Sequence, residues 1–490
     1  MPSDVIEIEA NRDRHQYASG GPLSAVISML ASLRINKIWR LLSPWPRTHG
    51  QPDALRPTAY LDGLRGFAAF LVYIHHHQLW AHVPAQRIFF ESSFCYDGYC
   101  YFAALPFIRV FFHGGHFAVA TFFVISGYVL SIKPMSLIHA GDHAKLADNL
   151  GSALFRRWLR LYIPLIATTF IFMAFTYIFD IWVAPLKRQS TFADEVWWWY
   201  CEVKNFTFIF HTRAEILSYN FHLWSIPIEM KGSIVVYTAL LAFARCTRSA
   251  RLWLQGGLMF YFMFIVDGWY CALFVAGMFI SDVELLAKKN ELPAFFERLR
   301  PHKMFIFYHF FFIAMFLGGI PAHSADVQEL RKNPGWYYLS FLKSQSIYDV
   351  KWFFLFFAAF MLVAAIPHIG WIKRFFETRF CQYLGRISFA LYLVHGPVIW
   401  TVGDRLYAAV GWWEEQRVLN LPQWVNIWEL PQTGPLGMEL SFLAPHIILF
   451  PLTLYLAELV TRMFDEPSVR FPQWLYKSTT IPVRPTKLPE

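Results

Sequence analysis

Arg65 and His76 are the residues of the first long apolar segment whose types could do chemistry. In a helix their separation of eleven residues is three turns plus about 20°, so they share one face, about 16 Å apart along the axis. A guanidinium there could bind phosphate or carbonyl oxygens, and an imidazole could act as a general base on a hydroxyl group. The two are too far apart for a dyad, so one ligand could touch both only if it were long and lay along the helix.

The other histidines nearby are expected to face elsewhere. His75 and His77 point about 100° to either side of His76. Adjacent histidines diverge on a helix, and no Cys, His or carboxylate spacing resembles a zinc site, so we expect no metal. The histidines weighed for a metal are His75, His76, His77, His82, His113 and His116. The alternative to a catalytic pair is structural: a buried Arg65 bonded to backbone carbonyls and a His76 bonded within the core.

Ser225 and Glu229 form a second candidate set, near the outward end of a later helix. They are four residues apart and therefore share a face. The Glu229 carboxylate could orient His76 or stabilise its protonated form, as in other base–carboxylate pairs. The alternative is a Glu229 that is bonded to neighbouring helices only.

A basic run, Arg156, Arg157 and Arg160, stands where another apolar segment begins. At the cytosolic mouth of a bundle these guanidinium groups could attract the phosphates of an anionic ligand. Arg160 is the strongest of these candidates because it lies one turn further inside. Equally, the run could only set the orientation of the chain in the membrane.

The composition indicates the environment in which these residues work. Of 490 residues, 56% are hydrophobic and only 16% are charged, whereas a soluble domain carries about 25% charged residues. The positive residues lie in short loops between apolar stretches, which is a pattern of membrane topology, so the net charge of +9 does not predict nucleic-acid binding.

The predicted fold is all-α: a polytopic membrane bundle of about ten helices, with both termini cytosolic. Leu252–Val266 and Trp269–Leu286 are interpreted as a tight hairpin, because merging them would put two basic loops outside. The predicted spans are Tyr60–Trp80, Val110–Ile132, Trp158–Asp180, His222–Ala244, Leu252–Val266, Trp269–Leu286, Lys303–Ile320, Lys351–Ile366, Phe380–Val402 and Ser441–Phe464.

The outward loops carry two features of a lumenal or extracellular side. Asn205–Thr207 is a glycosylation acceptor pattern. Cys95, Cys100 and Cys201 also fall in outward loops, where an oxidising lumen permits a disulfide, and free thiols are the alternative.

Three regions follow from this pattern. Residues 1–57 are a cytosolic tail, in which Pro22–Trp45 is either an amphipathic helix on the membrane surface or an unstructured basic segment. Residues 58–470 are the transmembrane domain, and residues 471–490 are a second cytosolic tail. Oligomeric state is left open.

Five sequence segments, in order, resemble the acyltransferase 3 family of integral membrane proteins. Glu466-Pro467 near the end also fits the family pattern, whereas Pro227 departs from it and could free a backbone carbonyl at the start of its helix. The segments are Leu61–Ala69 (LDGLRGFAA) with His76, Thr121–Tyr128 (TFFVISGY), Arg156–Pro164 (RRxxRxxxP), His222–Glu229 (HLWSIPIE) and Tyr383–His395 (YLGRISFALYLVH).

The resemblance implies a fungal-type membrane O-acyltransferase that moves an acyl group, most simply acetyl, from cytosolic acyl-CoA to a hydroxyl of a glycan or secondary metabolite. It implies Arg65 and His76 as the central pair, with Glu229 as a further functional carboxylate. Acyl-CoA is then a co-substrate, and no bound cofactor is expected. Arg386 and His395 are taken as structural rather than catalytic.

The membrane would be an endomembrane, in the ER or Golgi, or the plasma membrane. The alternative function is a transporter of a lipid or small metabolite, because carriers also use intramembrane Arg, His and Glu.

Overall fold

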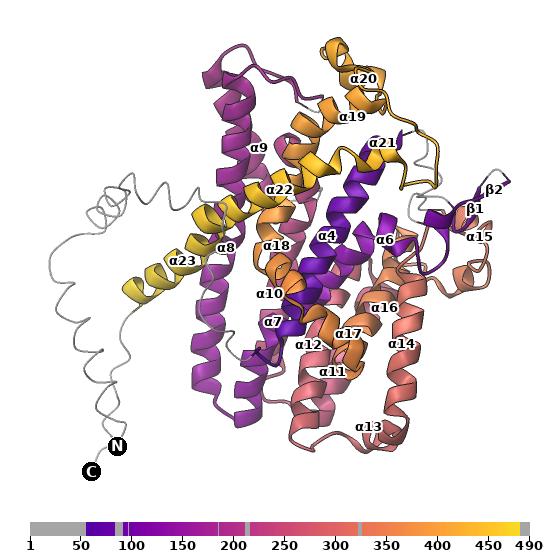
Figure 1. Cartoon of the computed structure of the whole chain (residues 1–490). Coiled ribbons are helices and arrows are strands. Elements are labelled where there is room, and N and C mark those ends of the chain that lie inside the picture. Colours follow the sequence, from indigo (N-terminus) through magenta and orange to yellow (C-terminus); the bar gives the residue numbers. More distant parts are fainter. Residues whose placement is uncertain are drawn as a thin grey trace. The chain divides into compact units, whose positions relative to one another are not determined.

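The computed structural model describes residues 55–83, 92–96, 98–184, 186–210, 216–321 and 326–480, and these form a bundle of α-helices (Figure 1). The predicted amphipathic segment Pro22–Trp45 lies outside the described residues. The longer helices are α4 (Ala59–Ala81), α7 (Gly115–Ala140), α8 (His143–Ile178), α9 (Phe192–Thr207), α10 (Ser225–Ala242), α11 (Arg248–Phe260), α12 (Trp269–Lys288), α14 (Lys303–Leu317), α16 (Val350–Ala365), α18 (Arg379–Val398), α22 (His446–Val460) and α23 (Glu466–Thr479).

Shorter elements connect these helices. The short α-helices are α6 (Val110–His113), α13 (Ala294–Leu299), α15 (Val327–Arg331), α17 (Gly370–Phe376), α19 (Asp404–Val410), α20 (Glu415–Val418) and α21 (Leu440–Leu443). The 3-10 segment η3 (Ser218–Trp224) leads into α10, and π-helical turns cover Tyr261–Ile265, Ile399–Gly403 and Thr461–Asp465. Two strands, β1 (Cys95–Tyr96) and β2 (Tyr99–Cys100), pair antiparallel in a small hairpin.

The predicted all-α membrane fold is confirmed, because every predicted span coincides with helical structure. Among the described residues, six helical segments are long and apolar enough to cross a membrane. They are Gly115–Ala140, His143–Ile178, Ser218–Ala242, Trp269–Lys288, Val350–His368 and Leu440–Thr479. The other predicted spans form α4, α11, α14 and α18, and the total of about ten crossings and the cytosolic termini remain predictions.

The predicted hairpin at Asp267 is two separate helices. The chain leaves the helical conformation at Val266 and resumes it at Trp269. Near the other end of the hairpin, Arg251 of α11 donates two hydrogen bonds, of 2.7 and 2.8 Å, to the buried carboxylate of Asp282 in α12. A buried charge pair of this kind is strongly destabilised by loss of one partner, so it fixes α11 against α12.

Helix α8 is longer than the sequence predicts. It starts at His143 rather than at Trp158 and covers 36 residues, or about 54 Å at 1.5 Å per residue. Asp142 caps its start by accepting a hydrogen bond from the Lys145 backbone N–H. The basic run is therefore part of a rigid helix, and the spacing of its side chains is set by the helical turn.

Glycines allow α4 and α18 to lie unusually close. A Cβ atom on Gly66 would lie 2.2 Å from the backbone nitrogen of Gly385, and one on Gly385 would lie 2.3 Å from the carbonyl oxygen of Asp62. Gly127 of α7 meets α12 in the same way, since its Cβ would lie 2.0 Å from the Phe274 carbonyl oxygen. Small residues at such crossings are typical of membrane helices.

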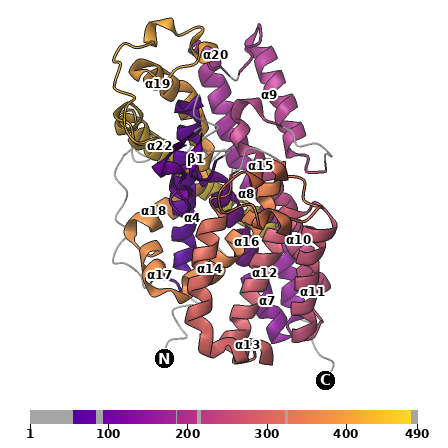
Figure 2. The same cartoon turned by 90° about the vertical axis from the view of Figure 1, so that its right-hand side faces the viewer.

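The two ends of the bundle carry helices from different sets of predicted loops. Figures 1 and 2 place α9, α19 and α20 at one end and α13 and α17 toward the other. The first group comes from predicted outward loops and the second from predicted inward loops. Helix α23 continues to Thr479 and Tyr476 packs against Phe155 of α8, and the cytosolic location of residues 471–490 stays a prediction.

Two local predictions have clear outcomes. Cys95 and Cys100 form a disulfide within the β1–β2 hairpin, and Cys201 is a free thiol. Pro227 lies in the first turn of α10, where a backbone N–H has no partner within the helix. The Leu223 carbonyl that Pro227 cannot bond accepts instead from the backbone N–H of Ser225, so it is not left free.

Candidate active site

The five sequence segments meet at one cavity of about 210 Å³ among α4, α7, α8, α10 and α18. Each segment supplies at least one wall residue, and Asp465 joins them from the π-helical turn before Glu466. The polar and charged wall residues are Arg65, Ser126, Arg157, Arg160, Ser225, Glu229, Arg386, Ser388, Tyr392 and Asp465. Four are guanidinium groups and two are carboxylates, so the wall is net positive and suits an anionic ligand.

Arg65 is held in place by α18 and by its own helix. Its Nε donates to Ser388 Oγ at 3.1 Å, one terminal nitrogen donates to the Gly385 carbonyl at 3.1 Å, and the same nitrogen lies 3.1 Å from Asp62. The hydrogen bond to the Gly385 carbonyl agrees with the structural alternative for Arg65, in which it is bonded to backbone carbonyls. The side chain also lines the cavity, with 35% of its surface exposed, so both roles are open to it.

Glu229 is bonded to neighbouring helices. Its carboxylate accepts a 2.5 Å hydrogen bond from the Ser126 hydroxyl and forms an ion pair with Arg157. Arg157 Nε also donates to Ser233 Oγ at 2.8 Å. In the part of the chain that the structure describes, no hydrogen bond joins Glu229 to His76, so the contacts support the alternative rather than a base–carboxylate pair.

The basic run divides between the cavity and its surroundings. Arg157 and Arg160, three residues apart on α8, both line the cavity, whereas Arg156 does not and its Nε donates to the Ser152 carbonyl at 3.0 Å. Among the described residues no hydrogen bond or ion pair within 4.0 Å is recorded for the Arg160 guanidinium. Arg386, which the sequence did not single out as a ligand, lines the cavity and pairs with Glu458 and Glu466.

Ser225 and Tyr392 separate the cavity from a group of histidines. The two hydroxyl groups are hydrogen-bonded at 2.8 Å, and both residues line the cavity. The Tyr392 hydroxyl also donates to the carbonyl oxygen of His222, and its ring lies 5.8 Å from that of His395. The wall at Tyr392 is therefore in direct contact with the histidines behind it.

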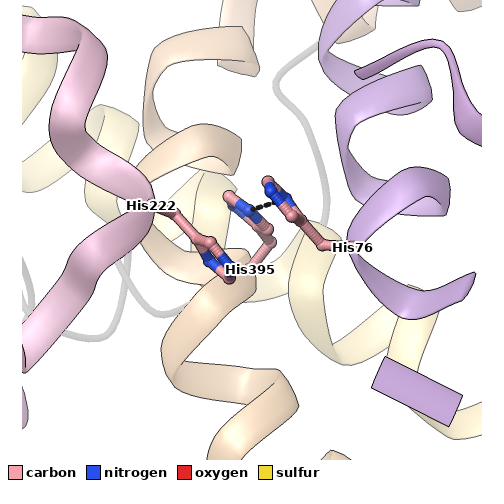
Figure 3. A group of neighbouring side chains, drawn as sticks. All are labelled: His76, His222 and His395. Carbon is pink, nitrogen blue, oxygen red and sulfur yellow. Dashed lines mark hydrogen bonds between the residues drawn. The ribbon is translucent and has the colours of Figure 1, made fainter. Parts of the chain in front are cut away.

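His76 belongs to this group with His222 and His395 (Figure 3). His76 Nδ1 and His395 Nε2 are 2.9 Å apart, and the His76 and His222 rings stack with centroids 3.8 Å apart. The three residues come from α4, η3 and α18. His222 and His395 are buried, and His76 is partly exposed, so His76 is the most accessible of the three.

The ring orientations fit hydrogen bonding better than metal binding. A metal lies in the plane of each imidazole that binds it, at about 2.0–2.1 Å from the nitrogen for zinc. The three rings are within 23° of parallel, and His222 meets His76 face to face. Lone pairs in stacked, nearly parallel rings do not converge on one point, although the ring nitrogens of all three lie within 4.8 Å of one another.

The neighbouring histidines face other helices, as the spacing predicts. The His75 ring lies 5.7 Å from His113 and 5.4 Å from His116. His77 Nδ1 is 2.7 Å from the Tyr407 hydroxyl. Only His76 reaches the His222–His395 pair.

Sequence reasoning missed His222 as a site residue and assigned His395 a structural role. Both stand in segments that resemble the family, His222 two residues before Trp224 and His395 at the end of its segment. Their meeting with His76 could not be read from periodicity, because it depends on how α4, η3 and α18 cross.

Fold and site together define a class: an integral membrane helix bundle with a cationic cavity beside a partly exposed histidine. Comparison with known protein families gives the same class a name. The acyltransferase domain of the acyltransferase 3 family matches residues 58–444. The chain belongs to this family and is an acyltransferase.

Curated relatives are fungal. The chain is 29% identical over 460 residues to the O-acetyltransferase PaAT-1 of Phomopsis amygdali, covering 86% of this chain and 85% of the relative. It is 24% identical over 483 residues to the acyltransferase clz18 of Cochliobolus lunatus, covering 88% and 98%. Acyltransferase R4 of a Phoma species is 24% identical over 405 residues, covering 72% and 84%. No solved structure matches the chain.

Proposed function

We propose that the chain is a membrane O-acyltransferase that takes an acyl group from cytosolic acyl-CoA and transfers it to a hydroxyl group. The observation that carries the proposal is the juxtaposition of a cavity with four arginines and the partly exposed His76 behind its Ser225–Tyr392 wall. An anionic carrier and a general base are the two things that this reaction needs.

The donor binds with its phosphates at the arginines. Arg160 and Arg65 supply guanidinium groups suited to phosphate or pantetheine carbonyl oxygens. Arg157 supplies a third and is held by Glu229. In this proposal Glu229 acts through Arg157 and the shape of the donor cavity rather than on His76 directly. The thioester end of the donor then extends along α4, and it reaches His76 when the hydrogen-bonded Ser225–Tyr392 wall between them opens.

His76 acts as the general base. Its Nε2 accepts the proton of the acceptor hydroxyl while the hydroxyl oxygen attacks the thioester carbonyl carbon. The carbon–sulfur bond then breaks, the acyl group stays on the acceptor oxygen, and the CoA sulfur leaves as a thiolate that takes up the proton from His76. Direct transfer and a transient acyl-histidine are both compatible with this geometry.

The acyl group is most simply acetyl, since one relative carries the name O-acetyltransferase. The acceptor is a hydroxylated glycan or secondary metabolite, and the membrane is an endomembrane or the plasma membrane. These choices rest on the resemblance to fungal relatives.

The test uses the full chain in lipid vesicles with radiolabelled acetyl-CoA and a panel of hydroxylated sugars and lipophilic alcohols. The expected result is acceptor-dependent release of CoA with label on the acceptor. The transporter alternative predicts saturable uptake of a solute without thioester cleavage, and that outcome would refute the proposal.

Variants of α4 separate the two roles. His76→Ala should lower kcat by a factor of about 10²–10⁴, the usual contribution of a general base, while acetyl-CoA binding stays near wild type. Arg65→Ala should weaken acetyl-CoA binding instead. A His76→Ala variant that transfers acyl groups at the wild-type rate would eliminate the proposed base.

A further inference from the structure

His76 is not bonded to a carboxylate in the described structure, which raises the question of what holds a general base in the required tautomer. The two nitrogens of a neutral imidazole differ, because one carries a proton and the other a lone pair. The partner of the first nitrogen decides whether the second can accept a proton. The hydrogen bonds around His395 determine this partner.

The chain of bonds begins at a backbone carbonyl. His395 Nδ1 lies 3.2 Å from the carbonyl oxygen of Leu391, one turn earlier in α18. A carbonyl oxygen can only accept, so His395 Nδ1 carries the proton. The neutral His395 ring then has its lone pair on Nε2, which lies 2.9 Å from His76 Nδ1. His76 Nδ1 must therefore donate, and the lone pair of His76 is on Nε2.

We propose that His395 is a positioning residue that fixes the tautomer and orientation of His76, so that His76 Nε2 is the base that faces the acceptor hydroxyl. This inference rests on the proposed function and names a partner for its base. When His76 Nε2 takes the acceptor proton, its Nδ1–H still donates to His395, and this bond becomes charge-assisted and stronger. His395 then does for His76 what a carboxylate does in a Ser–His–Asp triad.

His222 completes the arrangement from the side. Its ring lies against the face of His76 at 3.8 Å and within 5.0 Å of Trp400. This packing opposes rotation of the His76 ring, so the bond to His395 keeps its direction. The three rings can be followed in Figure 3, where the dashed line joins His76 and His395 only.

The test replaces the acceptor nitrogen of His395. His395→Leu keeps a similar volume but cannot accept from His76, and kcat should fall by up to about 10⁴-fold, the loss seen when a catalytic histidine is left in the wrong tautomer. The KM for acetyl-CoA should stay within about twofold, because the donor cavity is untouched. His395→Gln offers an amide oxygen in place of Nε2 and should recover most of the lost kcat.

A matched control is His446→Leu. His446 is also an intramembrane histidine, bonded through Nδ1 to the Tyr73 hydroxyl at 2.9 Å, and it lines neither the cavity nor the His76 group. Its replacement should leave the kcat/KM ratio near wild type, and thermal unfolding of all three variants shows whether they fold alike.

The outcomes distinguish this inference from the proposed function. A wild-type kcat in His395→Leu, or equal losses in the Leu and Gln variants together with lost acetyl-CoA binding, would overturn the positioning role and leave the acyltransferase proposal standing. Failure of the wild-type chain to transfer acyl groups to any acceptor would overturn both. Stoichiometric zinc in purified wild type, lost in His76→Ala, would also overturn the inference.

Discussion

Arg160 is the guanidinium that is best placed to bind an anion in the cavity. It lies one turn beyond Arg156 and Arg157, lines the cavity with Asp465, and within the described residues makes no side-chain hydrogen bond or ion pair shorter than 4.0 Å. Arg65, Arg157 and Arg386 are each already bonded to protein oxygens. An ordered guanidinium without an intramolecular partner keeps its donors for a ligand.

Arg160→Ala should therefore raise the KM for acetyl-CoA by about 10- to 100-fold, since a hydrogen bond to a charged group contributes about 1.5–3 kcal/mol. Steady-state kinetics over a range of acetyl-CoA concentrations measures this change. Arg156→Ala is the matched control, because it removes the same charge from the same helix at a side chain outside the cavity. Equal rises in both variants would indicate a general electrostatic effect instead of a bound phosphate.

Residue pairing is the part of the site that the sequence predicts least well. Spacing on one helix correctly put Arg65 and His76 on one face and turned His75 and His77 away. It could not reveal that Glu229 is bonded to Arg157 or that His76 is bonded to His395, because each pair joins helices that are distant in the chain. Such contacts depend on helix crossings, which a periodic pattern within one segment does not contain.

At the scale of elements, the site depends on the close packing of α4 against α18. Three separate groups of polar contacts span it: Arg65 with Ser388 and the Gly385 carbonyl, His76 with His395, and Gln382 with the Ala59 carbonyl. The close approach that allows these contacts depends on Gly66 and Gly385. A small change in the separation of these helices should therefore disturb donor binding and base positioning together.

Gly385→Ala should lower both stability and activity. Its Cβ would lie 2.3 Å from the Asp62 carbonyl oxygen, a backbone atom that cannot rotate away, and overpacking of this kind costs about 1–3 kcal/mol. Thermal unfolding and kcat/KM in vesicles measure the two effects. Gly256→Ala in α11 is the control, because nothing lies within 4 Å of its added Cβ and Ala favours a helix. A fully active and stable Gly385→Ala variant would show that this crossing tolerates separation.

Apolar length predicted where helices occur, but helix ends follow other rules. All ten predicted windows are helical, yet α8 begins fifteen residues before its apolar stretch, at the Asp142 cap. The polar first half of α8 is stabilised by its cap and by packing, and neither depends on hydropathy. Similarly, α23 continues past the apolar stretch to Thr479 because it packs against α8.

For the molecule as a whole, sidedness decides whether the proposed reaction is possible. The cavity arginines are reached by cytosolic acyl-CoA only if the N-terminal half of α4 and the basic run on α8 belong to the cytosolic side. The loop charges predict this orientation, and the two ends of the bundle separate the predicted inward and outward loops (Figure 2). Sidedness itself needs a chemical marker on each end.

Asn205 provides that marker on the predicted outward side. It is exposed in the last turn of α9 and stands in the acceptor pattern Asn205–Thr207. Expressed in a eukaryotic cell, the chain should carry one glycan that is removed by a glycosidase and is absent in Asn205→Gln, as gel mobility will show. The matched control is the double variant Leu292→Thr, Pro293→Ala, which completes an acceptor pattern without a following proline at exposed Asn290, next to the inward loop's Lys288-Lys289. It should stay unmodified, because that loop does not meet the lumenal transferase. A glycan at Asn290 and none at Asn205 would show that the topology is the reverse of the predicted one. The cavity would then face a compartment in which cytosolic acyl-CoA cannot reach Arg160.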